Sequence, residues 1–575
     1  MFLPDIWGQG ALFACSGASC TKTSSGAIEA RLCSDSFALR FLSDNVCTLK
    51  ISAENTEDVI FNTVMTDYIH ATVKTGSGET DVRIMFVAMD TVLICADSDI
   101  GITPVFENEI TQKKNKTCTV YSDSHETFAL GVRNSDDGAL TAAFSYGKKA
   151  ADRVKEALLA NPYEQEERIT AFYASLPEFR IPNEQIEKLY YRCASVLSAS
   201  VFSAEGIIKS GYIAVEADGK KSLQPFYSSI CTLGLRHILP DLAKDTLESI
   251  LASVAADGML SSHITPTGKS EDLCPPTLAW CFWELYTVNG DRAMLENAYA
   301  TLKKYLHYII ETRDINKNHL FEWQISGEGE PGRESAMDNS PRFDDGVILD
   351  CVDFSCYTAN EAKYMKLIAD EIDKHGEALY WGVMYERIKN AVNEHLFDED
   401  DKTYYDKAVV SNMFKKIKTS VSFLPLFAGI CENRHAMALL KLLNNEDKFN
   451  LKYGIPSVSR DSEEYSDDMF RGPMHIVTNY MIAKGLESYV MHDKANEIKS
   501  RYLERVISEY YADGVLYEFY SADGTKSAGN LSKKGCSTNF TLCRSIVNQR
   551  DFAPTAAIII DMLLSRSKKL PSGKY

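Results

Sequence analysis

The chain has 575 residues, which exceeds one ordinary hydrophobic core and predicts two domains. A formal net charge of −19 argues against binding to the phosphate backbone of a nucleic acid. No apolar run is long enough to span a membrane, and the first residues lack the basic start of a signal peptide. The 15 cysteines are scattered without CxxC pairs, which is typical of free thiols in a reducing compartment. We therefore expect a cytoplasmic protein without nucleic-acid or membrane partners.

The first part of the chain, residues 1–160, has the pattern of an antiparallel β-sandwich. Short segments rich in Val, Ile, Thr and aromatic residues follow one another, such as FALRFLS, CTLKISA and DVRIMFVAMDTVLICA. Turn-forming stretches such as GSGET and NSDDG separate them, and this alternation is typical of domains built from two packed sheets. A linker is expected at residues 161–182.

Over residues 183–575 the apolar period becomes helical. Long amphipathic runs recur, such as DRAMLENAYATLKKYLHYIIETR and HIVTNYMIAKGLESYV. Apolar residues at i, i+3, i+4 and i+7 predict helices, and the Gly- and Pro-bearing loops between them predict helical pairs. A closed helical toroid, an (α/α)6 barrel, fits better than an open solenoid because the sequence shows no clean short repeat. The loops at one end of such a toroid converge on a central pocket.

Two polar loops carry acidic residues that could do chemistry. The loop ESAMDNSPRFDDG contains Asp338 beside apolar neighbours, and the hairpin DGVLYEFYSADG contains Glu518 among aromatic ones. A carboxyl group in such a setting can act as an acid at neutral pH, and two of them across a pocket can hydrolyse a glycosidic bond. The alternative, in a chain with 80 acidic residues, is that both are solvated surface charges.

Tryptophan side chains offer flat apolar faces that bind sugar rings. Trp323, in the loop HLFEWQISG, is the strongest candidate for such a platform. Trp280 is a second candidate, whereas Trp283 fits the core of a helix better.

One segment partly matches a calcium-binding loop. DINKNHLFE places Asp314, Asn316 and Asn318 at positions 1, 3 and 5 of an EF-hand-like pattern. Position 6 is His319 where glycine is needed, and position 12 is Ile325 where glutamate is needed. A polar turn is therefore favoured over calcium, and we expect no metal and no cofactor.

Five segments follow one another within residues 183–565: CPPTLAW, ESAMDNSPRFD, FLPLFAGI, YGIPSVSRDSEEYSDDMFRGPMHIVTNYMIAKGL and LYEFYSADG. Together they resemble a group of α-glycosidases with an (α/α)6 barrel, which includes trehalase, mannosylglycerate hydrolase and processing α-glucosidase I. The resemblance implies an N-terminal β-sandwich and hydrolysis of an α-glycosidic bond, in a small glycoside or oligosaccharide, with inversion. It implies Asp338 as the general acid and Glu518 as the general base, about 6.5–9.5 Å apart.

The same resemblance implies which residues bind the sugar. Asn339 and Arg342 from the loop of the acid, and Arg471 from the RGP element, are expected to bind or orient it. Trp323 would form one wall of the pocket. The other expected substrate-binding residues are Tyr227, Tyr517 and Trp280.

The chain departs from the pattern of this group at several pocket positions. Phe226 and Tyr227 stand where the group has a Trp-Asp pair whose aspartate holds sugar hydroxyls. Phe470 and Thr538 each stand where the group has tryptophan. The reaction type is therefore better supported than the sugar. Three alternatives stay open: a related phosphorylase or epimerase, a carbohydrate-binding protein that has lost catalysis, and a helical scaffold for protein partners.

Overall fold

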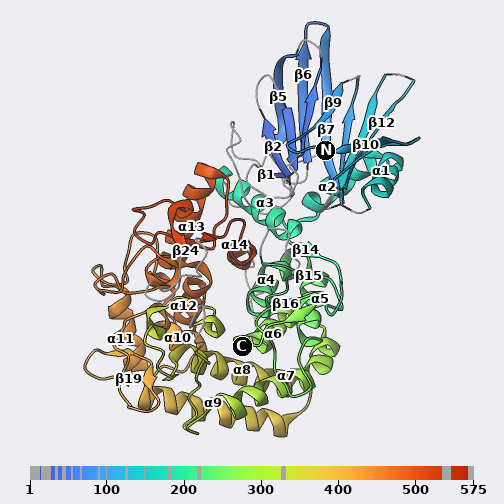
Figure 1. Cartoon of the computed structure of the whole chain (residues 1–575). Coiled ribbons are helices and arrows are strands. Elements are labelled where there is room, and N and C mark those ends of the chain that lie inside the picture. Colours follow the sequence, from blue (N-terminus) through green and yellow to red (C-terminus); the bar gives the residue numbers. More distant parts are fainter. Residues whose placement is uncertain are drawn as a thin grey trace. The chain divides into compact units, whose positions relative to one another are not determined.

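The computed structural model describes most of the chain. The described residues are 13–14, 28–32, 37–41, 47–53, 56–64, 68–88, 91–98, 100–123, 127–136, 138–147, 149–178, 183–215, 222–325, 332–533 and 546–567. They fall into two compact units (Figure 1). The first comprises the elements up to Ser200 together with Tyr510–Val515, and the second comprises most of the remaining chain.

Two β-sheets make up most of the first unit. One has the strand order β1–β2–β3–β4–β9, and the other has the order β10–β11–β12–β13–β8–β7–β6–β5. Neighbouring strands pair antiparallel, except that β1 and β2 pair parallel. The strands are β1 (Phe13–Ala14), β2 (Ile28–Leu32), β3 (Phe37–Phe41), β4 (Cys47–Ser52), β5 (Thr56–Val64), β6 (Tyr68–Thr75), β7 (Gly78–Ala88), β8 (Thr91–Ala96), β9 (Gly101–Phe106), β10 (Thr111–Lys114), β11 (Thr119–Ser122), β12 (Thr127–Asn134) and β13 (Leu140–Tyr146).

The two sheets share one hydrophobic core. In β4 the buried residues alternate with more exposed ones, so Cys47, Leu49 and Ile51 face the core. They belong to the same cluster as buried residues of β6, β7, β8, β12 and β13. The predicted antiparallel β-sandwich in the first part of the chain is therefore confirmed.

Three helices follow the sheets along the chain. They are α1 (Ala150–Leu159), α2 (Pro162–Ser175) and α3 (Glu184–Ala199). Helix α1 packs against β8, β12 and β13. Helix α2 occupies much of the segment expected as a linker, because Asn161 caps its N-terminus and Pro162 suits its first turn.

Helices dominate the second unit. They are α4 (Pro225–Ile238), α5 (Pro240–Leu251), α6 (Leu278–Asn289), α7 (Arg292–Thr312), α8 (Val352–Glu371), α9 (His375–His395), α10 (Leu424–Ala428), α11 (Asn433–Leu443), α12 (Ile476–Ser488), α13 (His492–Asp513) and α14 (Ala553–Ser567). Short strands lie in the connecting loops: β14 (Val201–Phe202), β15 (Tyr212–Ile213), β16 (Ile264–Thr265), β17 (Gly268–Lys269), β18 (Leu349–Asp350), β19 (Phe397–Asp398), β20 (Thr403–Tyr404), β21 (Lys407–Ala408), β22 (Met474–His475), β23 (Phe519–Tyr520), β24 (Ser532–Lys533) and β25 (Ile546–Val547).

The even-numbered helices from α4 to α14 form a closed ring (Figure 1). Each contacts the next, so that α4 meets α6, α6 meets α8, α8 meets α10, α10 meets α12, α12 meets α14, and α14 meets α4 again. The odd-numbered helices lie around this ring: α5 contacts α4 and α6, α7 contacts α6 and α8, and α9 contacts α8. Alternation of inner and outer helices is the predicted (α/α)6 arrangement, so the helical toroid is confirmed.

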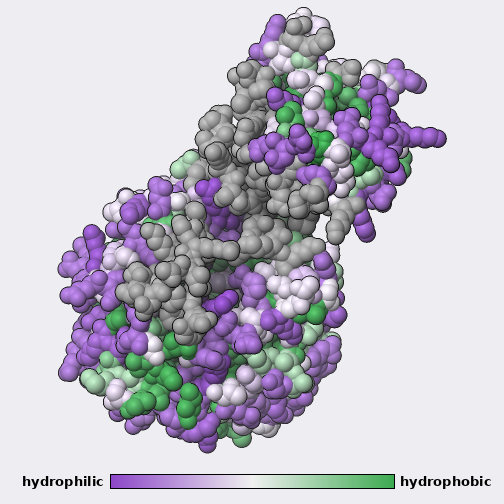
Figure 2. Space-filling model, viewed as in Figure 1, coloured by the Kyte–Doolittle hydropathy of each residue, from purple (hydrophilic) through white to green (hydrophobic). Residues whose placement is uncertain are grey.

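Hydrophilic residues predominate on the face of the molecule seen in Figure 2, as the net charge of −19 leads us to expect. Apolar residues form smaller patches among them. No described helix is both long and apolar enough to cross a membrane.

Two glycines allow helices of the ring to approach closely. A Cβ atom at Gly234 of α4 would clash with the backbone oxygen of Ala557 in α14. A Cβ atom at Gly485 of α12 would lie 2.5 Å from the backbone nitrogen of Phe427 in α10. These neighbours are backbone atoms that cannot rotate away, so a larger residue would push the helices apart.

We expect Gly234→Ala to destabilise the protein, because the added methyl group would force α4 away from α14 where the ring closes. Overpacking of this kind costs about 1–3 kcal/mol in the free energy of unfolding, which denaturant titration measures. The matched control is Gly376→Ala in α9, where a Cβ atom would meet no atom within 4 Å. Equal stability of Gly234→Ala and the wild type would contradict a close approach of α4 and α14.

Candidate active site

The loop at residues 332–346, which contains Asp338, is anchored at its start by a buried glutamate. Glu334 accepts hydrogen bonds from the backbone N–H groups of Leu273 at 2.9 Å and Gln324 at 2.8 Å. It also forms an ion pair with Arg313 at 2.7 Å. Burial raises the pKa of Glu334, and the charge of Arg313 opposes this shift. Glu334 therefore ties the loop to two neighbouring segments.

A buried arginine with two carboxylates holds the middle of the loop. The guanidinium of Arg342 donates to Asp353 at 2.5 Å and to Asp406 at 2.8 Å, and all three side chains are buried. Asp353 lies in the first turn of α8, and Asp406 lies between β20 and β21. The loop is thus joined to two further segments. Because these carboxylates already occupy its donors, we infer that Arg342 acts by positioning the loop rather than by binding a sugar directly.

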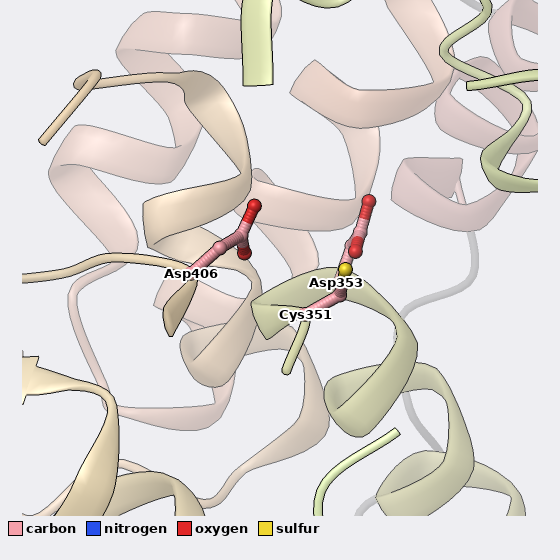
Figure 3. Close-up of side chains that lie close together, drawn as sticks. All are labelled: Cys351, Asp353 and Asp406. Atoms are coloured by element: carbon pink, nitrogen blue, oxygen red, sulfur yellow. The ribbon is translucent and has the colours of Figure 1, made fainter. Parts of the chain in front are cut away.

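Asp353, Asp406 and Cys351 also form a group of potential metal ligands, with ligand atoms within 4.8 Å of one another (Figure 3). Arg342 already forms an ion pair with each of the two carboxylates. Burial raises the pKa of Cys351 well above its ordinary value, so its sulfur stays a thiol, which donates to the Leu349 carbonyl at 3.2 Å. A cysteine that binds a metal must lose its proton. The arrangement therefore favours an internal ion pair over a metal centre.

Asn339 and Arg471 connect the same loop to the RGP segment. Oδ1 of Asn339 accepts a hydrogen bond from the backbone N–H of Phe470 at 3.0 Å. The Nδ2 atom of Asn339 is buried without a hydrogen-bond partner, so it is still available as a donor. Arg471 forms an ion pair with Asp344 at the far end of the loop.

Glu518 is buried directly before strand β23, which pairs with β22. Its backbone N–H donates to the carbonyl of Gln549 at 3.1 Å. The next residue, Phe519, donates to the side-chain oxygen of Asn548 at 3.4 Å and accepts from its nitrogen at 2.7 Å. These hydrogen bonds at Glu518 and at the next residue therefore fix the backbone from which the Glu518 side chain extends.

Tyr227, in the first turn of α4, lies against the loop of Asp338. Its side chain is partly exposed, and its hydroxyl donates to the carbonyl of Ala336 at 3.3 Å, two residues before Asp338. Burial raises the pKa of Tyr227 well above its ordinary value, and the charges of Glu518 and Asp338 raise it further. Electrostatic effects of this kind fall off with distance. Asp338 and Glu518, which are far apart in the sequence, therefore both lie near one phenol.

The two candidate tryptophans are buried. Trp323 is 2% exposed, stacks on Phe354 with ring centroids 3.7 Å apart, and donates from Nε1 to Asp353 at 3.0 Å. Trp280 is 1% exposed and packs edge-on against Phe427 with centroids 5.0 Å apart. Trp323 thus shares Asp353 with the arginine of the Asp338 loop. Trp280 lies among the ring helices, where its Nε1 donates to Glu284 at 3.4 Å.

Tyr517, the residue before Glu518, is also buried. Its backbone N–H donates to the hydroxyl of Tyr520 at 2.8 Å, and its carbonyl accepts from the hydroxyl of Thr555 at 2.8 Å. Through these backbone bonds Tyr517 supports the hairpin that carries Glu518.

Comparison with known proteins places the helical part of the chain in a glycoside hydrolase family. A sequence model of the mannosylglycerate hydrolase MGH1-like glycoside hydrolase domain matches residues 228–541, more than half of the chain. The chain belongs to this family. The resemblance to the (α/α)6 glycosidase group is thereby confirmed.

Individual relatives share a low identity with this chain. Mannosylglycerate hydrolase MGH1 of Selaginella moellendorffii is 31% identical over 134 residues, which cover 23% of this chain and 26% of that protein. An uncharacterized protein of Borreliella burgdorferi is 24% identical over 258 residues, which cover 44% of this chain and 51% of that protein. The chain therefore spans about half or less of the length of these relatives.

A solved structure shares the fold. The crystal structure of the GH63 mannosylglycerate hydrolase from Thermus thermophilus in complex with glucose matches with a TM-score of 0.54 at 18% identity. The match covers 65% of this chain and 99% of that chain. At this identity the likeness establishes a common fold.

Sequence reasoning missed the two acids that hold Arg342. For Asp353 a signal was present, because it lies in the apolar run CVDFSCY, where a buried charge requires a partner. For Asp406 no local pattern exists, because its partner is 64 residues away in the sequence. Thr538, one of the departures from the glycosidase pattern, lies outside the described residues.

The segment compared with a calcium loop contains buried acids. Asp314 accepts a hydrogen bond from the backbone N–H of Asn318 at 2.9 Å. The side-chain amides of Asn316 and Asn318 donate to Asp350 at 3.2 and 3.1 Å. These bonds are typical of a polar turn. Asp314, Asp350 and Glu322 are all buried.

We expect Arg342→Met to destabilise the protein strongly, because it leaves the carboxylates of Asp353 and Asp406 buried without their cation. Loss of one partner of a buried ion pair costs about 3–5 kcal/mol, measured by denaturant titration. The control is Arg434→Met, whose ion pairs with Glu399 and Glu432 lie at the surface and contribute little to stability. Equal losses in the two variants would show that the buried ion pair has no special role.

The buried carboxyl group of Glu322 leads to a second prediction, on how the stability of the protein depends on pH. Burial raises its pKa to about 8, and the neighbouring Asp350 and Asp314 contribute to the shift. Glu322 keeps its proton in the folded protein and loses it more easily in the unfolded chain. Its favourable contribution is therefore complete below about pH 4.5 and is lost as the pH rises through 8.

We expect the melting temperature of the wild type to fall by several degrees between pH 6 and pH 9, and Glu322→Gln to reduce this fall. Thermal unfolding is followed in the presence of a chelator, so that protons are the only ligand of the carboxylates. Glu394→Gln, at an exposed position of α9, is the control. Identical pH profiles of Glu322→Gln and Glu394→Gln would refute the assignment of this proton to Glu322.

Proposed function

We propose that this glycoside hydrolase cleaves the α-glycosidic bond of a small glycoside with inversion of the anomeric configuration. Asp338 acts as the general acid and Glu518 as the general base. The substrate is a small carbohydrate, and neither a metal nor an organic cofactor takes part in the reaction.

One observation carries this proposal: the segments of Asp338 and Glu518 meet at Tyr227. The hydroxyl of Tyr227 donates to the carbonyl of Ala336, two residues before Asp338. Its ring lies against His475, whose strand partner Phe519 directly follows Glu518. Two acids from distant segments are thus gathered beside one partly exposed side chain, in a chain of a glycoside hydrolase family. Each acid is carried by a backbone that is held on both sides. A pair of carboxyl groups in fixed positions is what glycoside hydrolysis requires.

In the proposed reaction Asp338 donates its proton to the glycosidic oxygen while the bond from that oxygen to the anomeric carbon breaks. Glu518 accepts a proton from a water molecule, whose oxygen forms the new bond to the anomeric carbon from the opposite face. The products are the alcohol and a sugar of inverted configuration. Solvent then removes the proton from Glu518 and returns one to Asp338. A water molecule fits between the two groups when they are about 6.5–9.5 Å apart.

Asn339 has a direct role in this proposal. Its Oδ1 is fixed by the backbone of Phe470, which leaves Nδ2 as a buried donor directly after the general acid in the chain. A sugar hydroxyl or the glycosidic oxygen would satisfy this donor. Arg342 and Trp323 act indirectly, because the polar groups of their side chains are bonded to other parts of the protein. Tyr517 supports the hairpin of Glu518 through its backbone hydrogen bonds.

The first substrate to test is mannosylglycerate, because relatives of this chain carry the name mannosylglycerate hydrolase. A panel of α-mannosides and α-glucosides with small leaving groups should accompany it. Assays with and without phosphate separate hydrolysis from phosphorolysis, since a phosphorylase releases a sugar phosphate and depends on phosphate.

We expect Asp338→Asn and Glu518→Gln each to lower kcat by at least about 100-fold, because each removes a proton transfer from the reaction. Circular dichroism and thermal unfolding should show that both variants keep the fold. The matched controls are Asp447→Asn and Glu446→Gln, which change exposed residues in the same two ways. Full activity of either active-site variant would eliminate its residue as acid or base.

The configuration of the first product tests the mechanism itself. Proton NMR of a fresh digest of an α-glycoside should show the β-anomer first, before the free sugar equilibrates in water. Release of the α-anomer first would mean retention and would require a covalent intermediate on the enzyme instead of a general base.

A further inference from the structure

A pocket with a volume of about 500 Å³ lies between helix α11 and the hairpin of β19 and β20 (Figure 1). None of the described residues that line it belongs to the loop of Asp338, to the hairpin of Glu518 or to α4. Its volume is within the range of small-molecule sites. This pocket, which we call the α11 pocket, is therefore separate from the candidate active site and large enough for a ligand of its own.

His435 of α11 lines the pocket, and its side chain is 1% exposed. Its ring stacks on Phe397 of β19 with centroids 3.5 Å apart. The Nε2 atom is buried and has no hydrogen-bond partner. Oε1 of Glu399 lies 4.0 Å from Nε2, which is too far for a hydrogen bond. A buried polar atom without a partner costs free energy, so a ligand that bonds Nε2 removes that cost.

The contacts of the other ring nitrogen define what Nε2 requires. Nδ1 lies 3.0 Å from Oδ1 of Asn393, whose Nδ2 donates to the carbonyls of Lys389 and Ile430, both at 2.7 Å. The hydroxyl of Tyr404 donates to the same Oδ1 at 2.7 Å, so its oxygen, 2.9 Å from Nδ1, is a second acceptor. Nδ1 therefore carries the proton of the ring. Burial lowers the pKa of His435, which keeps the ring neutral. Nε2 is thus an acceptor, and it requires a ligand with an O–H or N–H group.

The charged residues of the α11 pocket favour an anion. Four basic and two acidic residues line it, although the whole chain has a net charge of −19. Three of the basic residues already pair with carboxylates, namely Lys402, Arg434 and Lys448. Lys441, in the last turn of α11, is exposed and has no such pair among the described residues. One ammonium group is thus left for a ligand with a single negative charge.

Asn445 and an apolar wall complete the pocket. The side-chain oxygen of Asn445 accepts from the backbone N–H of Asp447 at 2.9 Å, which leaves the N–H groups of Nδ2 for a ligand. A carboxylate can accept from an ammonium and an amide at once. Phe397, Met437 and Leu442 also line the pocket, and such side chains suit a hydrocarbon skeleton.

We propose that the α11 pocket is a second ligand site of the protein, which binds a hydroxy acid with an apolar carbon skeleton. The carboxylate binds Lys441 and Asn445, and the hydroxyl group donates to Nε2 of His435. The skeleton packs against the apolar wall. This inference goes beyond the proposed function and does not depend on it, because it assigns no residue of the pocket to the hydrolysis.

Binding of matched small molecules to the full chain tests the inference. The hydroxy acids mandelate and 3-hydroxy-3-phenylpropanoate are titrated calorimetrically beside phenylacetate and 3-phenylpropanoate, which lack only the hydroxyl group. The matched diols, 1-phenylethane-1,2-diol and 1-phenylpropane-1,3-diol, lack only the charge. At least one hydroxy acid should bind about 5-fold more tightly than its partner without the hydroxyl group, and about 10-fold more tightly than its diol. Absence of binding by both hydroxy acids, or affinities equal to those of their partners, would overturn the inference.

Two substitutions then locate the bound molecule. Lys441→Met removes the exposed ammonium group and should weaken binding of the hydroxy acid about 10-fold. The matched control Lys366→Met removes an exposed ammonium group of α8 and should leave the affinity unchanged. His435→Phe keeps a ring that stacks on Phe397 and removes Nε2, so it should abolish the difference between the hydroxy acid and its partner without the hydroxyl group. An unchanged affinity of Lys441→Met, or an unchanged difference in folded His435→Phe, would refute this placement.

The test does not depend on the folding of His435→Phe, because the wild-type affinities decide on the hydroxyl group and Lys441→Met decides on the position. Lys441→Met should also leave kcat for any glycoside substrate unchanged. A lower kcat in this variant would contradict a site apart from the catalytic one. If the wild type binds the hydroxy acid as expected but hydrolyses no glycoside of the panel, this inference stands and the proposed function fails.

Discussion

The guanidinium of Arg342, buried between Asp353 and Asp406, is the interaction on which the candidate active site depends. Removing three charged groups from water is expensive, and such a cluster is not retained for stability alone. Here it joins the loop of Asp338 to the start of α8 and to the segment between β20 and β21. Asp353 extends the network, because it also accepts from the indole of Trp323. A loop without a long helix or strand thereby obtains a fixed position.

The other half of the site is held by different forces. The position of Glu518 is fixed by strand pairing and by hydrogen bonds of its backbone and that of Phe519 to residues 548–549. Tyr227 lies in α4, and Phe552 directly precedes α14. These two helices close the ring. The glycine at position 234 lets these helices approach. The same helix contacts therefore close the toroid and form the site. The distant segments of the site meet only when the ring is complete.

The sequence predicted the fold well because its signals are local. Period-two strands and period-3.6 helices can be read within one segment, and both units have the expected architecture. The position of Asp338 came from an ordered set of motifs. The contacts of its neighbours were harder to predict: Arg342 was expected to bind or orient the sugar, and the motif gave no sign that its guanidinium donates to Asp353 and Asp406. Pairing across 64 residues leaves no local pattern, so only the folded structure reveals it.

The contacts of the site suggest why reaction type and substrate can change separately. The acid loop is fixed by buried charges at Glu334 and Arg342, where a single substitution leaves an unpaired charge in the interior. The wall at Tyr227 is fixed by ring packing and one hydrogen bond, which tolerate exchange of one aromatic residue for another. Substitutions are thus costly in the loop that carries Asp338 and cheaper in the ring packing around Tyr227. That difference explains how a chain can keep the acid motif of its family while its pocket aromatics differ.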